Sequence, residues 1–182
     1  MARGAGGKED KMSQSEIASV PAAQAGKYLT FQLGPETFGL EILKVQEING
    51  LMNVTHVPRT PRFVRGVINL RGKVIPVVEL RVKFGMEECP DTEHTCIIVV
   101  QVSHAGSRVT MGIIVDEVSE VLEIKSEQLE PAPSFGDQVD TEFILGVGKV
   151  GQKVIMLLDV DRVLGAGEVG FVRQAGISEM VA

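Results

Sequence analysis

The sequence contains no tryptophan, a single tyrosine and only two cysteines in 182 residues. So few aromatic side chains leave little for stacking on the bases of single-stranded nucleic acid. The net charge of −6 also argues against nucleic acid, because binding to phosphates requires a basic surface. Cys89 and Cys96 cannot build a disulfide framework, and in a reducing cytosol we expect both to be free thiols.

Long apolar runs are also missing, since none approaches the ~20 residues that a membrane-spanning helix requires. The N-terminal segment lacks the apolar core of a signal peptide. These absences predict a cytoplasmic protein with no direct membrane insertion and no nucleic acid among its partners.

Catalytic motifs are absent as well. No phosphate-binding loop of the form G-x4-G-K-S/T occurs, and His56, His94 and His104 each lie in a polar, loop-like stretch. One cluster, from Cys89 to Cys96, has metal-ligating residue types, but its C-x4-H-x-C spacing lacks the paired C-x2-C of structural zinc sites. The sequence therefore predicts a protein that is not an enzyme, with no catalytic residues, no cofactor and no metal.

The two ends of the chain differ from its middle. Residues 1–26 and 166–182 are poor in large apolar side chains, so burial there cannot offset the entropy lost on ordering. We expect a flexible N-terminal tail, a folded region over residues 27–165 and a C-terminal tail. The folded region begins with apolar and polar residues in alternation over 28–33, which predicts a half-buried strand.

Two further segments are more ambiguous. Residues 41–49 fit both a strand and a helical stripe, and the flanking glycines and the β-branched side chains favour the strand. Thr60 and Pro61 are typical of a helix start and Gly66 of a helix end, so we expect one or two helical turns between them.

A β-hairpin is predicted over residues 67–80. Its turn is Arg71-Gly72, in which glycine supplies a positive φ. Pro76 lies within the second strand, and because proline cannot donate a ladder hydrogen bond, this predicts an edge position.

The most informative feature is an internal repeat. Residues 38–48 align with 111–121, and residues 63–85 align without a gap with 143–165. The second alignment contains seven identical pairs: Phe63/Phe143, Gly66/Gly146, Val67/Val147, Lys73/Lys153, Val74/Val154, Ile75/Ile155 and Gly85/Gly165.

A repeat of about five strands suits a small closed barrel, which leaves no exposed sheet edge. We therefore predict an all-β fold of two pseudo-symmetric five-stranded SH3-like β-barrel lobes with short helical turns. The first lobe is expected over about 27–88 and the second over about 89–165, intertwined at their ends. A groove between the lobes is the natural place for a partner.

Several segments resemble the CheW family of chemotaxis coupling proteins. They are F-G-L-E-I-L-K-V-Q-E-I-N-G, P-R-F-V-R-G-V-I-N-L-R-G-K-V-I-P-V-V-E-L-R, M-G-I-I-V-D-E-V-S-E-V-L, P-A-P-S-F and F-I-L-G-V-G, and the likeness covers about residues 27–165. The resemblance implies a non-enzymatic adaptor that couples methyl-accepting chemoreceptors to the histidine kinase CheA. It further implies that the partners are the cytoplasmic receptor tip and the regulatory domain of CheA, and that the protein is recruited to membrane-bound receptor arrays.

The resemblance also implies positions for the two contacts. Receptor binding maps to Val45, Glu47, Gly66, Arg71 and Val121. Kinase binding maps roughly to Val54 and Val57.

The residues alone leave structural alternatives open. Arg71 aligns with Gly151 in the repeat, so the hairpin does not itself need a long cation, and the side chain either projects into solvent or meets a partner. Glu47 fits a solvated strand position, Val45 and Val121 fit the core, and Gly66 fits a backbone requirement.

Two other functions also stay open at this point. One is a small β-barrel that binds a ligand or nucleic acid, against which the acidity and the scarcity of aromatic residues count. The other is a CheW paralogue that serves another motility pathway.

Overall fold

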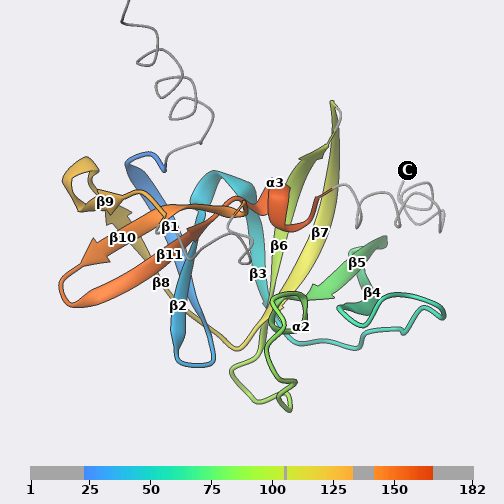
Figure 1. Ribbon diagram of the computed structural model, residues 1–182. Coiled ribbons are helices and arrows are strands. Elements are labelled where there is room, and N and C mark those ends of the chain that lie inside the picture. Colours follow the sequence, from blue (N-terminus) through green and yellow to red (C-terminus); the bar gives the residue numbers. More distant parts are fainter. Residues whose placement is uncertain (1–22, 105, 133–141, 166–182) are drawn as a thin grey trace, which may run out of the picture.

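The computed structural model describes residues 23–104, 106–132 and 142–165, and strands dominate it (Figure 1). Most of the expected N-terminal tail and all of the C-terminal tail lie outside the described residues. The strands are β1 (Gly26–Leu33), β2 (Glu36–Glu41), β3 (Val45–Gly50), β4 (Val64–Leu70), β5 (Lys73–Glu79), β6 (Cys96–His104), β7 (Ser107–Val115), β8 (Glu117–Ile124), β9 (Leu129–Glu130), β10 (Ile144–Val150) and β11 (Lys153–Leu158).

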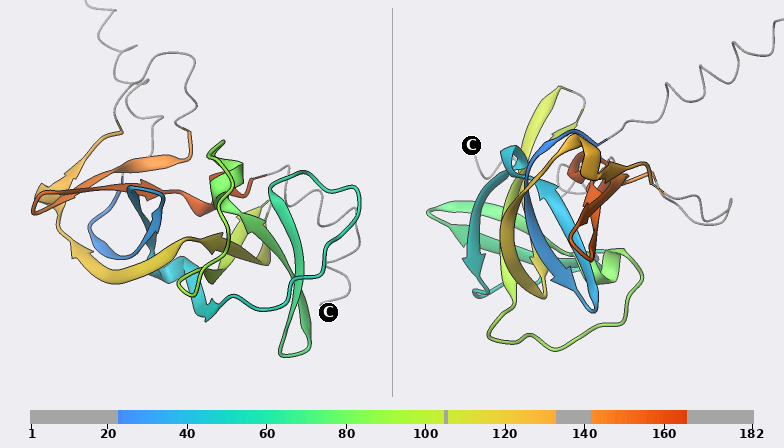
Figure 2. Two further views of the ribbon diagram at one scale, coloured as in Figure 1. Left: turned by 90° about the horizontal axis from the view of Figure 1, so that it is seen from below. Right: turned by 90° about the vertical axis from the view of Figure 1, so that its left-hand side faces the viewer.

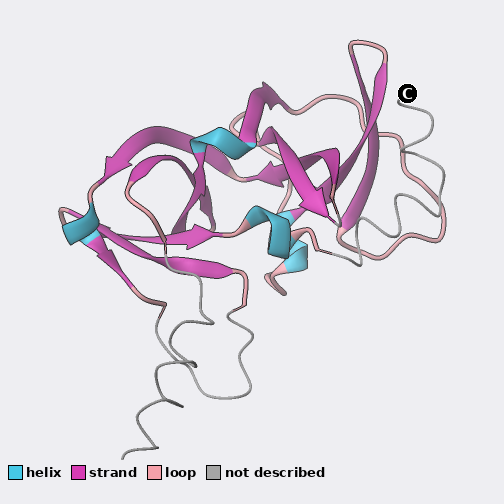
Figure 3. Ribbon diagram, turned by 90° about the horizontal axis from the view of Figure 1, so that it is seen from above, coloured by secondary structure: helices cyan, strands magenta, loops and turns pink. Residues whose placement is uncertain are grey.

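Helical segments are short and lie in connections between strands (Figure 3). They are η1 (Ile42–Lys44), α2 (Leu80–Lys83), η2 (Ser126–Gln128) and α3 (Val160–Val163). The strands form two sheets, one in the order β8-β1-β2-β11-β10-β9 and one in the order β3-β6-β7-β5-β4. We call them the six-stranded lobe and the five-stranded lobe; they lie side by side in Figures 1 and 2. The predicted all-β, two-lobed fold is confirmed.

The division of the chain between the lobes differs from the expected boundary near residue 88. Strands β3 to β7 form the five-stranded lobe, which therefore runs across that boundary. The reason is that the chain changes lobes between β2 and β3, and again between β7 and β8. The six-stranded lobe thus combines the hairpin β1–β2 with strands from the second half of the chain, and the five-stranded lobe combines the hairpin β6–β7 with strands from the first half.

The internal repeat is seen in the structure. Strand β4 and strand β10 match at an offset of 80 residues, and β5 with α2 likewise matches β11 with α3 to within one residue. Both hairpins carry a register shift at the same place, between Val64 and Gly66 and between Ile144 and Gly146. The same local sequence has therefore produced the same local geometry twice.

Each sheet is closed by the segment that follows one of its edge strands. After β3, Thr55 pairs with Val67 of β4, the opposite edge, through two backbone hydrogen bonds of 2.8 and 2.9 Å. After β8, the chain forms β9, which pairs with β10 at Leu129↔Gly148 and Glu130↔Val147. Because the two edges are bridged, both sheets curl into the small barrels that the repeat predicted.

The core consists of three apolar clusters. The largest lies between the lobes and includes Phe31 from one sheet and Ile98 from the other, while a smaller cluster fills each lobe. Strand β1 lies between two clusters, so Tyr28 and Thr30 are as buried as Phe31. The prediction of a half-buried first strand was wrong for these residues; the Thr30 hydroxyl is satisfied by donating to the Glu120 carbonyl at 2.7 Å.

Three local predictions can be compared with the structure. Residues 45–50 form a strand, as favoured, preceded by the single turn η1. The helical turn expected between Thr60 and Gly66 is absent, and Gly66 lies inside β4. Pro76 is not on an edge strand, because β5 lies between β7 and β4; its missing N–H is tolerated since β5 pairs with β7 only over Val77–Glu79.

Candidate functional site

An ion pair joins two of the residues implied in receptor binding. The Arg71 guanidinium donates from Nη1 to Oε2 of Glu47 at 2.7 Å and from Nη2 to Oε1 at 3.1 Å. Arg71 occupies the turn between β4 and β5, and Glu47 lies on β3, the edge strand across the barrel opening. The arginine side chain is 76% exposed, whereas that of Glu47 is 22% exposed. The guanidinium of the pair is therefore exposed to solvent, whereas the carboxylate that binds it is largely covered.

The Glu47 carboxylate is held by a second donor. The Asn49 side-chain amide donates to Oε1 at 2.8 Å. Because these hydrogen bonds favour the charged form, first that from Asn49 and then those from Arg71, the pKa of Glu47 lies below its usual value. Glu47 and Asn49 share one face of β3, since side chains alternate along a strand.

A shallow polar recess of about 300 Å³ lies beside this ion pair. Strands β3, β5, β6 and β7 and the β4–β5 hairpin all contribute to its lining. The lining residues are Gln46, Glu47, Leu70, Arg71, Lys73, Ile75, Gln101 and Thr110. The sequence did not indicate the other four polar lining residues, which are Gln46, Lys73, Gln101 and Thr110. They lie on four different strands, and only Lys73, which is repeated at Lys153, left a signal in the sequence.

The two valines implied in receptor binding have different surroundings. Val45 on β3 is half-buried and packs against the cluster between the lobes. Val121 lies on β8 in the six-stranded lobe and is 48% exposed. A purely structural role as a core residue therefore fits Val45 but not Val121.

Gly66 is buried and has a structural reason to be glycine. A Cβ on Gly66 would lie 2.1 Å from the Thr55 carbonyl oxygen and 3.0 Å from Cγ1 of Val54, and its φ is +149°. Its interpretation as a helix end is wrong, but the backbone does require glycine at this position. The absence of a side chain allows Thr55 to pair with Val67 and so to close the five-stranded lobe. Gly66, implied on the receptor side, thus lies against Val54, implied on the kinase side.

Val57 lies in the same β3–β4 connection as Val54. Both valines are half-buried, and Val54 packs against the cluster inside the five-stranded lobe. The Val57 carbonyl accepts from the Thr60 hydroxyl at 2.9 Å, so Thr60 stabilises a turn in place of the predicted helix start.

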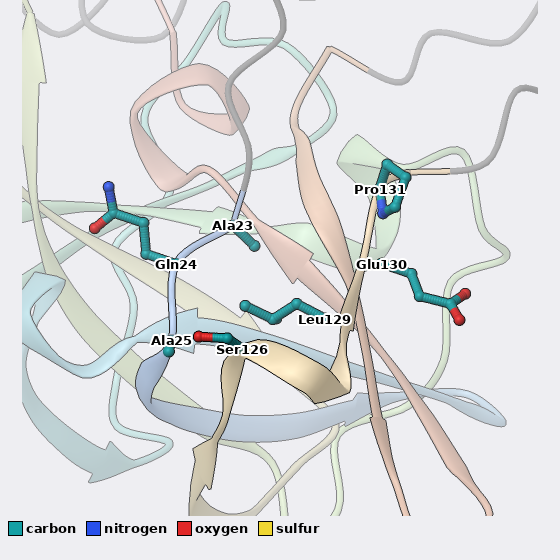
Figure 4. A pocket seen from close by; sticks show the side chains of 7 residues that line it. All are labelled: Ala23, Gln24, Ala25, Ser126, Leu129, Glu130 and Pro131. Carbon is teal, nitrogen blue, oxygen red and sulfur yellow. The ribbon is translucent and has the colours of Figure 1, made fainter.

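The expected groove between the lobes is not where the recess lies. The lobes meet through the largest apolar cluster, and the recess beside Arg71 is lined by the five-stranded lobe alone. A second recess, of about 460 Å³, lies in the six-stranded lobe between the chain leading into β1 and the β8–β9 connection. In Figure 4, Ala23 and Leu129 point toward each other across it, whereas Glu130 points away.

Two ion pairs that sequence reasoning missed hold the lobes where the chain crosses between them. Asp116, between β7 and β8, accepts from Nε of Arg81 at 3.2 Å, from Nη2 of Arg81, and from the backbone N–H of Gly34 at 2.7 Å. Near the other crossing, Lys44 donates to Asp161 at 2.9 Å. The signal lay in the repeat, which places Arg81 and Asp161 at equivalent positions.

The candidate metal cluster is not assembled. Cys89 is exposed, Cys96 is partly buried, both are free, and the Cys96 thiol lies 3.2 Å from the His94 carbonyl. Across residues 23–104, 106–132 and 142–165, no three or more His, Cys, Asp or Glu side chains are grouped to hold a metal ion. Nor does this part of the chain contain a helix long and apolar enough to cross a membrane.

The relation to known proteins agrees with this architecture. The family model for the CheW-like domain matches residues 27–168. The chain belongs to the CheW family.

Individual CheW relatives match over most of their lengths. A protein from Klebsiella aerogenes described as chemotaxis protein CheW is 42% identical over 158 residues, which are 87% of this chain and 92% of the relative. The chemotaxis protein CheW of Rhizobium meliloti is 35% identical over 140 residues, 77% of this chain and 88% of the relative. The crystal structure of scaffolding protein TtCheW from Thermoanaerobacter tengcongensis matches with a TM-score of 0.70 and 34% identity, covering 80% of this chain and 96% of that chain.

Proposed function

We propose that the chain is a non-enzymatic chemotaxis adaptor that couples methyl-accepting chemoreceptors to the histidine kinase CheA. Membership of the CheW family and the names of its relatives, chemotaxis proteins and a scaffolding protein, support this proposal. The adaptor is cytoplasmic and is recruited to membrane-bound arrays by binding the receptor tip. Its other partner is the regulatory domain of CheA.

The observation that carries the receptor side is the conformation of Arg71. Its φ is +53°, in the left-handed region that non-glycine residues seldom adopt. At the equivalent position the other hairpin has Gly151, with a φ of +63°. A residue kept in an unfavourable backbone conformation is accounted for when its side chain has a task, and an exposed arginine on a rigid turn suits protein recognition.

The receptor surface in this proposal consists of Val45, Glu47, Arg71 and Val121, with Gly66 acting through the backbone. Glu47 orients the guanidinium, and Val121 supplies exposed apolar area on the neighbouring lobe. The kinase surface lies in the β3–β4 connection near Val54 and Val57. Because Gly66 contacts that connection, its substitution affects both surfaces.

The proposal is tested by titrating Arg71→Glu separately with a receptor-tip fragment and with the CheA regulatory domain. We expect receptor affinity to fall by at least about 30-fold, which corresponds to the ~2 kcal/mol of an arginine hot spot. Both the loss of the guanidinium and the repulsion between the new carboxylate and Glu47 contribute to this fall in affinity. Affinity for the regulatory domain and the melting temperature should stay near their wild-type values, because the side chain is exposed.

A matched control comes from the other hairpin. Gly151→Arg places an arginine at the equivalent turn, and it should neither change receptor binding nor create a second site, because its surroundings differ. Unchanged receptor affinity in Arg71→Glu, or loss of both partners together with a lower melting temperature, would contradict the assignment.

A further inference from the structure

We propose that the recess beside the Glu47–Arg71 pair receives an acidic side chain of the receptor and that Lys73 is the cation that holds it. The proposal rests on the proposed function, because it specifies the chemistry of the receptor-side partner. It concerns residues that neither the internal repeat nor the family resemblance marked as binding.

The recess contains polar groups that the fold itself does not use. The side chains of Gln46, Lys73, Gln101 and Thr110 make no hydrogen bond or ion pair with any residue in the described part of the chain. Gln101 and Thr110 are half-buried, whereas Gln46 and Lys73 are exposed. By contrast, the half-buried Asp161 carboxylate accepts from Lys44 and from the Ser103 N–H. Four uncommitted polar side chains from four different strands therefore converge on one recess.

These groups are suited to an anionic acceptor. The lysine ammonium has three donors and no acceptor, each glutamine amide has two donors, and the threonine hydroxyl has one. Glu47 is the one carboxylate in the lining, and its oxygens already accept from Asn49 and Arg71. With Arg71 and Lys73 against Glu47, two cations face one anion. A carboxylate from a partner, which can only accept at neutral pH, complements this arrangement.

The equivalent lysine in the other lobe provides a comparison. Lys153 begins β11 as Lys73 begins β5, and neither lysine has a partner among the described residues. In the six-stranded lobe, however, Gly151 stands in place of Arg71. The repeat aligns Glu120 with Glu47, and the Glu120 side chain makes no ion pair with a residue in the described part of the chain. The two lysines thus share the K-V-I start of their strands but differ in their neighbours, since Lys73, unlike Lys153, lines a recess beside an arginine–glutamate pair.

The test is calorimetric titration of a receptor-tip fragment into wild-type protein, Lys73→Gln and Lys153→Gln, at low ionic strength and in about 1 M salt. We expect Lys73→Gln to bind about fivefold more weakly at low ionic strength, the upper range for a partly exposed ion pair. The difference should vanish in about 1 M salt, where the Debye length is only about 3 Å. Lys153→Gln should bind as the wild type does, and both variants should melt at the wild-type temperature.

A second arm identifies the receptor group. Acidic residues of the receptor fragment are changed singly to their amides, and the one that meets Lys73 should show no further loss when combined with Lys73→Gln. Wild-type affinity for Lys73→Gln, or equal losses in Lys73→Gln and Lys153→Gln, overturns this proposal while receptor binding itself stands. A receptor fragment that does not bind the wild-type protein overturns the proposed function as well.

Discussion

The hairpins β4–β5 and β10–β11 are two copies of one structure, yet their turns differ in chemistry. Both have seven residues in the first strand, the same register shift and a left-handed residue at the first turn position. That residue is Arg71 in one copy and Gly151 in the other. Glycine adopts this conformation freely, whereas arginine does so against its preference. The shared features build the barrel, and in the proposed function the recognition surface lies at the turn that has the arginine.

The lobe crossings show the same relation between geometry and chemistry. Arg81 in α2 and Asp161 in α3 occupy equivalent positions and carry opposite charges. Each has a partner of the opposite sign close to a crossing, Asp116 in one case and Lys44 in the other. An ion pair therefore lies near each crossing, formed by the cation of α2 in one case and by the anion of α3 in the other.

The largest difference between the two lobes is expected when the glycines that allow barrel closure are replaced. Gly66→Ala should lower the free energy of unfolding by about 3 kcal/mol, because the new Cβ would lie 2.1 Å from the Thr55 carbonyl and the φ of +149° disfavours a side chain. Gly146→Ala should cost about half as much, since its Cβ would lie 2.8 Å from the Glu130 carbonyl and no left-handed φ adds strain. Urea unfolding of both variants measures the difference.

Gly50→Ala is the control for this pair, because nothing lies within 4 Å of its Cβ position. Its unfolding free energy should stay within about 0.5 kcal/mol of the wild type. If Gly66→Ala and Gly146→Ala lower the unfolding free energy equally, the tighter contact at Gly66 does not make closure of the five-stranded lobe more sensitive than closure of the six-stranded lobe.

A smaller effect is expected at the crossings. Asp116→Asn should cost about 2 kcal/mol of unfolding free energy, because a partly buried carboxylate that accepts from Arg81 and from the Gly34 N–H loses its charge. Asp161→Asn should cost about 1 kcal/mol, since its bonds to Lys44 and the Ser103 N–H are fewer. Denaturant titration of both variants at neutral pH provides the comparison.

The pH dependence of the stability provides a further test of the Asp116 ion pair. Burial raises the pKa of Asp116, but the hydrogen bonds from Arg81 and Gly34 lower it by more, so the folded-state pKa lies below its usual value. The stabilisation is then complete above the unfolded-state pKa of about 3.9 and is lost as the pH falls through the folded-state pKa. The gap between wild type and Asp116→Asn should therefore narrow below about pH 4. If the difference in unfolding free energy stays constant down to the pH of acid unfolding, the charge of Asp116 is not the source of the stabilisation.

The repeat and the alternation of apolar residues were sufficient to predict the two lobes, but not how the strands are shared between them. A repeat identifies which segments are alike, and it does not say whether a hairpin pairs within its own half or with the other. The burial of Thr30 was missed for a similar reason, because the carbonyl that satisfies it belongs to Glu120, 90 residues away. Gly66 was misread because a glycine required by a close carbonyl and a glycine that ends a helix look the same in sequence.

For the candidate site, the sequence pointed to Glu47 and Arg71 separately but not to their contact. The two residues are 24 positions apart, and only the curling of the sheet brings the β4–β5 turn against β3. The sequence also gave no indication that Gln46, Gln101 and Thr110 share a recess, because each belongs to a different strand. Contacts across a closed barrel depend on strand order and register, which local patterns do not specify.

Arg71→Gly should have the smallest effect on the fold. It gives the β4–β5 turn the residue that the β10–β11 turn has at the same position, and so it tests directly what the arginine contributes. Glycine relieves the left-handed conformation but increases the entropy of the unfolded chain, and the ion pair lost with it is exposed. These effects offset one another, so the melting temperature should stay within about 2 °C of the wild type. Receptor affinity should nevertheless fall at least about tenfold, as expected when an interface arginine is truncated. Arg71→Lys, which keeps the charge without the bidentate geometry, should lie between the two. If Arg71→Gly binds the receptor as the wild type does, the arginine is only a solvated turn residue.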